Sequence, residues 1–319
     1  MASLLFRKIL IKIKNAIRFI INLLVQLISV PIILLYIFMS FLPIKFLYQF
    51  FYSGAKLIDK ISGKYLSLRT FNRIKKYLPN KNQSEINHIV SSHFQYTTCF
   101  VAEFIKSLSP FVNFKNGDIN IQNTEIFERD FPDTNIIVCY SGHFYNFELL
   151  TNIMSTISTY DFYFLYADMG PNALIEKLLK YKRSRYGANL LSTKEIFKLR
   201  KIAERYQNSQ DKKMIIGVLG DIRPKNKGVS FDFLGSRRVF YTGMERLGTI
   251  LGAAFMYASI SCCERGKASI SFLPLNIGKE EKDLNEKFPI TKKYVHLLSN
   301  DIYRNPERWM LWNEQLNVD

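Results

Sequence analysis

Short apolar runs alternate with helix-like segments from residue 120 onward, and this alternation restricts the fold more than any other feature of the chain. Such runs are typical of strands buried on both faces of a sheet. They lie at 135–140, 162–167, 214–220, 255–260 and 268–275. The helix candidates are 145–156, 172–183, 194–207, 243–252 and 289–303. The pattern predicts an α/β fold in which helices flank a mostly parallel mixed sheet, with ligands at the carboxyl ends of strands.

The N-terminal part of the chain follows a different pattern. Residues 1–18 carry basic side chains and no acidic one, and no charge occurs from Phe19 to Ile44. A bilayer core is spanned by about 20 apolar helical residues, so the run predicts a membrane helix, kinked at Pro31. Basic residues flank the run on both sides, which leaves a spanning helix, a kinked hairpin and a deep interfacial helix all open.

These two patterns divide the chain into three predicted regions. We expect a membrane anchor at 1–44, a helical membrane-proximal region at 45–118 and an α/β core at 119–319. Apolar residues at three- and four-residue steps support helices in the middle region.

The charge and cysteine content narrow the classes of partner. Lys and Arg number 44 against 27 acidic residues, a net charge of +17. This excess favours a polyanionic partner, and the apolar N-terminal run favours anionic lipid over nucleic acid. Cys99, Cys139, Cys262 and Cys263 show no disulfide or zinc spacing, which favours a reducing compartment. No nucleotide or metal motif occurs in the sequence, so no cofactor is expected.

The segment IIVCYSGHFYNFELL, residues 136–150, is the strongest candidate for chemistry. A predicted strand ends near Tyr140, Ser141 and Gly142 turn the chain, and His143 lies at that turn. A neutral imidazole at such a place can act as a general base. We expect Glu148 to hold the ring in one tautomer, provided that His143 lies before the following helix. A histidine and a glutamate at this spacing also arise by chance, so the pair alone is a weak signal.

Several segments together resemble the lipid A late acyltransferases of Gram-negative bacteria. SGHFYNFELL is similar to the family's HX4(D/E) motif, in which Asn146 matches while Tyr145 and Phe147 depart from the usual residues. Four later blocks follow in family order: KRSRYG (182–187), GDIRPKNKGVSFDFLG (220–235), YTGMERLGTILGAAF (241–255) and NPERWMLWNEQL (305–316). Ile222 and Asn313 stand where the family usually has Gln and His.

The resemblance implies an acyltransferase that moves a fatty acyl group from an acyl-carrier-protein thioester to a membrane lipid hydroxyl, on a lipid A precursor or a related lipid. It places the enzyme at the inner membrane with its catalytic domain facing the cytoplasm. His143 and Glu148 would be catalytic, and the other site residues would bind substrate. These are Asn146, Arg183, Arg185, Asp221, Arg223 and Arg246. An aminolipid or lysophospholipid acceptor, and a non-catalytic basic membrane protein, are the alternatives.

The basic residues of two of these blocks have more than one interpretation. Arg183 and Arg185 can bind a phosphate or simply cap a helix. The loop that carries Arg223, Lys225, Lys227, Arg237 and Arg238 can be a solvated surface, or it can hold anionic lipid or an acidic carrier protein.

Overall fold

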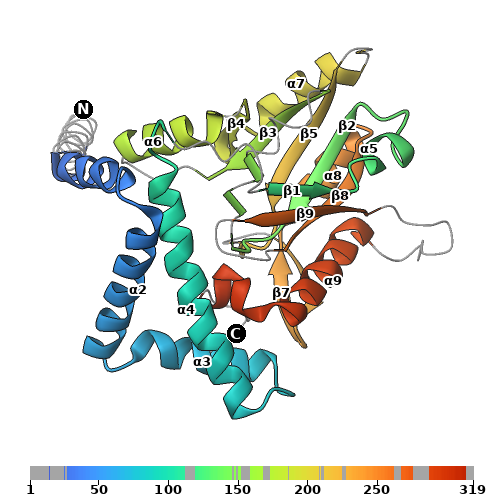
Figure 1. Ribbon diagram of the computed structural model, residues 1–319. Coiled ribbons are helices and arrows are strands. Elements are labelled where there is room, and N and C mark those ends of the chain that lie inside the picture. Colours follow the sequence, from blue (N-terminus) through green and yellow to red (C-terminus); the bar gives the residue numbers. More distant parts are fainter. Residues whose placement is uncertain are drawn as a thin grey trace, which may run out of the picture.

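The fold was taken from a computed structural model (Figure 1). It describes residues 14, 25, 27–111, 119–145, 147, 148, 150, 151, 159–167, 173–185, 187–207, 209, 212–224, 228–261, 267–275 and 287–313.

Seven strands form one sheet in the order β1-β9-β8-β2-β5-β3-β4. They are β1 (Ile119–Gln122), β2 (Ile136–Ser141), β3 (Tyr160–Tyr166), β4 (Asn189–Ser192), β5 (Lys213–Leu219), β8 (Ala254–Ser261) and β9 (Ala268–Pro274). All neighbouring pairs are parallel except β8 and β9, which are antiparallel. The predicted mostly parallel mixed sheet is therefore confirmed.

The central strand β2 positions the candidate site. All six of its residues are buried, as expected for a strand with neighbours on both edges and cover on both faces. On one of these faces, the ring of Tyr140 stacks on Tyr294 at 4.9 Å between centroids. Val138 lies on the same face and packs close to Gly248. Helices α8 (Gly243–Ile250) and α9 (Pro289–Arg304) thus cover this face of β2.

The remaining helices of the core are α5 (Ile126–Arg129), α6 (Ala173–Ser184) and α7 (Phe197–Gln207), with a short 3-10 turn, η2 (Thr193–Glu195), before α7. The predicted helix at 145–156 lies partly outside the described residues. Within it, residues 147, 148, 150 and 151 have 3-10 conformation.

A two-stranded hairpin follows β5 and was not predicted. It consists of β6 (Val229–Phe233) and β7 (Ser236–Phe240), which pair antiparallel. Leu234 and Gly235 form its turn, with φ angles of 50° and 73°. Positive φ at both central residues matches the right-handed twist of a two-residue hairpin.

Three helices form an arm on one side of the sheet (Figure 1). They are α2 (Ile44–Ile61), α3 (Tyr65–Tyr77) and α4 (Gln83–Lys106). The helix α4 begins at a capping box between Asn82 and Glu85. The last elements among the described residues are two 3-10 turns, η4 (Pro306–Arg308) and η5 (Met310–Asn313). The turn η4 packs between α4 and α9, so the C-terminal segment joins the arm to the core.

The predicted membrane helix is not supported by the described part of the chain. Residues 27–40 are helical, but no helix among the described residues is both long and apolar enough to cross a bilayer. Most of residues 1–26, which carry the first part of the predicted anchor, lie outside the described residues.

Candidate active site

His143 lies at the turn that follows β2, where the sequence placed it. Its side chain is 14% exposed. Gly142 allows the chain to pass close to its neighbours here, because a Cβ atom at this position would lie 2.7 Å from Leu298 Cδ1 and 3.2 Å from Asp221 Oδ2. A glycine is therefore needed for the backbone to approach the carboxylate of Asp221 so closely.

Asp221 holds the imidazole ring of His143. Its Oδ1 lies 2.6 Å from His143 Nδ1, and its Oδ2 accepts a hydrogen bond of 2.7 Å from the backbone N–H of His143. The two residues meet because β2 and β5 are parallel neighbours, with Ser141 opposite Leu219. Each residue follows its strand by two positions, so both lie at the same edge of the sheet.

The environment of Asp221 determines which ring nitrogen carries the proton. Its carboxyl group is fully buried, which by itself would raise its pKa. The charge and hydrogen bonds of His143, with a hydrogen bond from Trp309, outweigh burial and hold that pKa below its ordinary value. An ionised carboxylate only accepts hydrogen bonds, so Nδ1 is assigned as the N–H and Nε2 keeps the lone pair. This is the tautomer of a general base.

Two other segments support the pair. The indole Nε1 of Trp309 donates to Asp221 Oδ2 at 3.0 Å, and Arg238 donates to the backbone carbonyl of Asp221 at 2.6 Å. The C-terminal segment also pairs with the backbone around His143. Met310 N–H donates to the His143 carbonyl at 2.9 Å, and Tyr145 N–H donates to the Arg308 carbonyl at 2.8 Å. The turn that carries His143 is thus fixed from both sides.

Glu148 does not have the role that the sequence predicted. Its oxygens accept hydrogen bonds from Lys182 at 3.2 Å and from Arg183 at 3.1 and 2.5 Å. The expectation that Glu148 orients the imidazole is corrected, because Asp221 holds Nδ1. Lys182 and Arg183 engage the oxygens of Glu148, and Asp221 already contacts Nδ1 of His143.

The carboxyl group of Glu148 is ionised in this cluster. Burial raises its pKa, but the charges and hydrogen bonds of Lys182 and Arg183 act more strongly together and lower it to about 2. Glu148 and Lys182 are both buried, and the ammonium group of Lys182 lies 4.0 Å from the centre of the Phe104 ring. The cluster therefore fixes two cations beside the turn that carries His143 and Phe147, whose rings are 4.8 Å apart.

The other predicted binding residues do not gather around the pair. Arg185 donates to the carbonyls of Ser107, Ser109 and Pro110, and so holds the segment that follows α4. Arg246 is exposed on α8 and lies 4.8 Å from the centre of the Phe288 ring.

The predicted basic loop also separates into different environments. Arg223 is partly exposed just beyond Asp221. Arg237 is exposed on the hairpin and pairs with Asp232 at 3.2 Å. Arg238 is buried against the rings of Phe233, Phe240 and Trp309, so it cannot form part of an exposed dock. Asn146, Lys225 and Lys227 lie outside the described residues.

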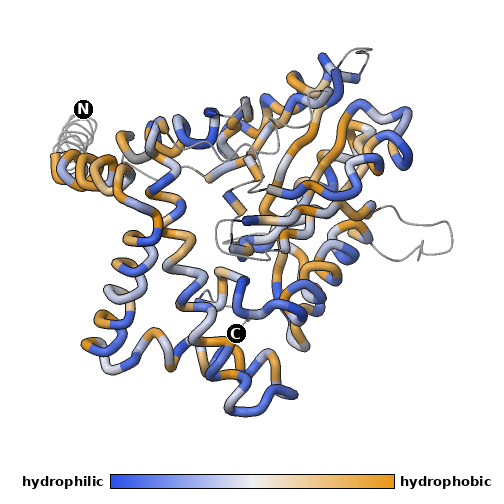
Figure 2. The backbone as a smooth tube through the Cα atoms, viewed as in Figure 1, coloured by the Kyte–Doolittle hydropathy of each residue, from blue (hydrophilic) through white to orange (hydrophobic). Residues whose placement is uncertain are grey.

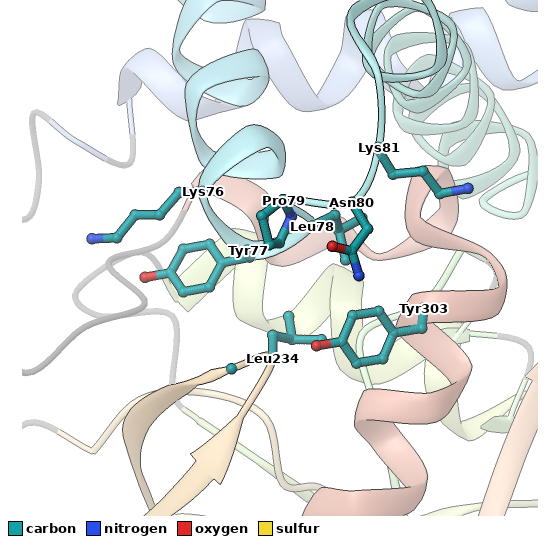
Figure 3. Close-up of a pocket in the computed structure, with 9 residues that line it drawn as sticks. Lys76, Tyr77, Leu78, Pro79, Asn80, Lys81, Leu234 and Tyr303 are labelled. Atoms are coloured by element: carbon teal, nitrogen blue, oxygen red, sulfur yellow. The ribbon is translucent and has the colours of Figure 1, made fainter.

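A surface hollow of about 390 Å³ lies away from the His143–Asp221 pair. Its walls come from the turn between α3 and α4, the tip of the β6–β7 hairpin and α9. Figure 3 shows Tyr77, Leu234 and Tyr303 on these three walls. Neither His143, Asp221 nor Glu148 lines the hollow. Within the described part of the chain, no three His, Cys, Asp or Glu side chains are placed to share a metal ion.

Comparison with known families identifies the family of the chain. The family model described as "Bacterial lipid A biosynthesis acyltransferase" matches residues 21–317. The chain belongs to this family. It is therefore an acyltransferase, and its family acts in lipid A biosynthesis. A search of curated proteins found no match to the chain.

The contacts of two residues of this acyltransferase, Asp221 and Trp309, were not predicted from the sequence. Asp221 was predicted to bind substrate and instead contacts the ring of His143. The position of Asp221 after a predicted strand was the available signal. Trp309 lies in the closing block of the family resemblance, 88 positions from Asp221, and local sequence gives no sign that the two residues touch.

Proposed function

We propose that this acyltransferase moves a fatty acyl group from an acyl-carrier-protein thioester to a hydroxyl of a membrane lipid, a lipid A precursor or a related molecule, with His143 as general base. The observation that carries this proposal is the hydrogen bond of 2.6 Å between His143 Nδ1 and Asp221 Oδ1. It leaves the lone pair on Nε2 at a strand end, where a substrate can approach.

The proposed reaction balances without a cofactor. Nε2 of His143 takes the proton of the lipid hydroxyl while the oxygen attacks the carbonyl carbon of the thioester. Asp221 stabilises the imidazolium that forms. The new C–O bond replaces the C–S bond, and the departing thiolate takes the proton from the imidazolium. The products are an ester and a free thiol on the carrier.

Glu148 is proposed to contribute through its neighbours rather than through the ring. Its hydrogen bonds hold Lys182 and Arg183 of α6 against the segment that follows His143. The charges of Glu148 and Glu103 both act on Lys182, which leaves the guanidinium of Arg183 as the cation suited to a phosphorylated lipid. Arg183 is a candidate for headgroup contact because its side chain is partly exposed.

The arm supports membrane association of the proposed enzyme. On α2, the exposed residues Phe46, Phe50, Leu57 and Ile61 recur at helical spacing and share one stripe. A second stripe beside it carries exposed lysines, including Lys56. The helix of residues 27–40 is also apolar and exposed, and Figure 2 shows both helices on the outer side of the arm. An apolar stripe beside lysines is typical of a helix that lies in the headgroup region of an anionic bilayer.

The proposed donor sets the side of the membrane. A carrier-protein thioester is a cytoplasmic donor, so we place the catalytic region on the cytoplasmic face of the inner membrane. The buried thiols of Cys99 and Cys139 are compatible with a reducing compartment.

The test is acyl transfer by the purified full-length chain. It is incubated with dodecanoyl- or tetradecanoyl-acyl carrier protein and either a lipid A precursor, an aminolipid or a lysophospholipid, and the products are identified by mass spectrometry. We expect ester formation that His143→Ala abolishes. Transfer by His143→Ala at the normal rate would overturn the proposed base. Transfer to the aminolipid or lysophospholipid alone would replace the proposed acceptor.

A further inference from the structure

Trp309 is fully buried next to His143 and Asp221. Its ring contacts Phe233 at 5.7 Å and Trp312 at 5.1 Å between centroids. An indole N–H is only a donor, and a buried one needs an acceptor. Trp309 donates to Asp221 Oδ2 at 3.0 Å. A backbone carbonyl would be a sufficient acceptor for a buried indole N–H. Trp312, which is equally buried, donates to the backbone carbonyl of Pro306.

The hydrogen bonds of Asp221 divide between its two oxygens. Oδ2 accepts from Trp309 and from the backbone N–H of His143, whereas Oδ1 lies 2.6 Å from the imidazole Nδ1. The two donors on Oδ2 hold that oxygen more firmly than one donor would, so the indole N–H of Trp309 restricts rotation of the carboxylate. Oδ1 is thereby directed at the ring.

The backbone on either side of Trp309 fixes the position of the indole relative to His143. Phe144 and Trp309 form an antiparallel bridge. The carbonyl of Arg308 accepts from Tyr145, and the N–H of Met310 donates to the carbonyl of His143. The indole and the imidazole are therefore held by one small set of backbone hydrogen bonds.

We propose that Trp309 is a positioning residue of the acyl-transfer site, whose indole N–H holds Asp221 Oδ2 so that Oδ1 is aimed at the ring of His143. This inference rests on the proposed role of His143 as general base. Trp309 touches neither substrate nor reacting atoms and acts through Asp221.

Loss of the indole N–H should shift the pH dependence of the reaction in one direction. Without it, less of the carboxylate charge is shared with Trp309, so Asp221 stabilises the imidazolium form of His143 more strongly. The acidic limb of the kcat/KM profile, below which His143 is protonated, then moves to higher pH. The carboxylate also becomes freer to rotate, which lowers kcat even above that limb.

The chain offers a matched test because it has only two tryptophans. In Trp312→Phe, biosynthetic incorporation of benzothienylalanine replaces Trp309 alone with a ring of nearly the same shape that lacks the N–H. In Trp309→Phe, the same analogue replaces Trp312 alone. Each chain is compared with the same variant carrying ordinary tryptophan, so the cavity left by phenylalanine cancels.

The readout is thiol release from dodecanoyl-acyl carrier protein with lipid acceptor present, measured as a function of pH. We expect the analogue at position 309 to move the acidic limb upward by about half a pH unit and to lower kcat about 10-fold. The donor KM should change less than about twofold. The analogue at position 312 should leave the limb in place. An unmoved limb at 309, or equal shifts at both positions, would overturn the inference. His143→Ala is run beside them, and its full activity would instead overturn the proposed base.

Discussion

The imidazole of His143 and the carboxylate of Asp221 lie 2.6 Å apart, although 78 positions separate them in the chain. Parallel pairing of β2 with β5 brings them together, since each follows its strand at the same edge of the sheet. Glu148 is close to His143 in sequence but is held by Lys182 and Arg183. The geometry therefore gives the two acidic residues different roles: Asp221 contacts the ring of His143, and Glu148 contacts the two cations of α6.

Asp221→Asn tests the first role. An amide that donates toward Nδ1 favours the tautomer with its proton on Nε2, which cannot act as a base. We expect kcat to fall about 10²–10⁴-fold while the fold is retained. The matched control is Asp161→Asn, because Asp161 lies at the start of β3, at the opposite edge of the sheet. Kinetics of both variants decide the matter, and a kcat for Asp221→Asn within about threefold of normal would contradict the assigned tautomer.

Glu148→Gln tests the second role. Its carboxyl has a folded pKa of about 2 against an ordinary 4.5, so its stabilising contribution is present above pH 4.5 and is lost as the pH falls toward 2. The variant leaves the buried Lys182 and the partly exposed Arg183 without their carboxylate and should lose about 3 kcal/mol of unfolding free energy at pH 7. Denaturant unfolding at pH 7 and at pH 3 measures both effects. Equal stability of the two chains at pH 7 would show that the cluster contributes nothing.

The sequence predicted the main sheet because its central strands are continuous apolar runs. The run 135–140 became β2 and the run 214–220 became β5, each within one residue. Short edge strands such as β1 and β4 carry no comparable apolar run and were missed. The β6–β7 hairpin was missed because Leu234 in its turn has a positive φ, which is uncommon for leucine and is not predicted from the residue type.

The candidate site was predictable only in its local part. The turn Ser141-Gly142 after an apolar run located His143, and a second strand end located Asp221. Their contact depends on the neighbour order of β2 and β5, which no local pattern contains. The order of strands also explains why Asp221, and not the sequence neighbour Glu148, contacts the ring of His143.

His93 gives the fold a second dependence on pH. It is buried on α4, and its Nδ1 lies 3.1 Å from the carbonyl of Glu307 in the C-terminal segment. Burial lowers its pKa to about 4, so the unfolded chain gains a proton near pH 6.5 and the folded chain does not. The contribution of His93 to the free energy of unfolding is thus fully present above pH 6.5. Below that pH the free energy of unfolding falls by about 1.4 kcal/mol per pH unit toward pH 4.

The measurement is unfolding free energy between pH 7.5 and 4.5 for His93→Asn and for His88→Asn, an exposed histidine on the same helix. The first variant should lose the slope below pH 6.5, and the second should keep it. An unchanged slope in His93→Asn would mean that another group takes up the proton.

The exposed stripe of α2 predicts contact with acyl chains. Phe50→Trp places a fluorescent probe on the stripe, and the two natural tryptophans are fully buried. Vesicles of phosphatidylglycerol with brominated acyl chains should quench this probe at least about twofold more than a tryptophan replacing Phe197, which is exposed on α7. The readout is independent of the N-terminal segment, because it reports the surroundings of residue 50. Equal quenching of both probes in vesicle-bound protein would exclude α2 from the bilayer surface.

The last prediction concerns the donor. An acidic carrier protein approaches a basic surface faster and binds it more tightly at low salt. Arg223 is partly exposed two positions beyond Asp221, and Lys225 follows it in the sequence. The variant with Arg223→Glu and Lys225→Glu should raise the donor KM about 10-fold at low salt and leave the acceptor KM unchanged.

The matched control reverses Arg200 and Lys201, two exposed cations of α7, and so changes the net charge equally. Saturation curves for both substrates at low and high salt separate the outcomes. If the acceptor KM rises while the donor KM stays constant, these cations contact the lipid headgroup. If both double variants raise the donor KM equally, the carrier protein responds to net charge and has no dock beside Asp221.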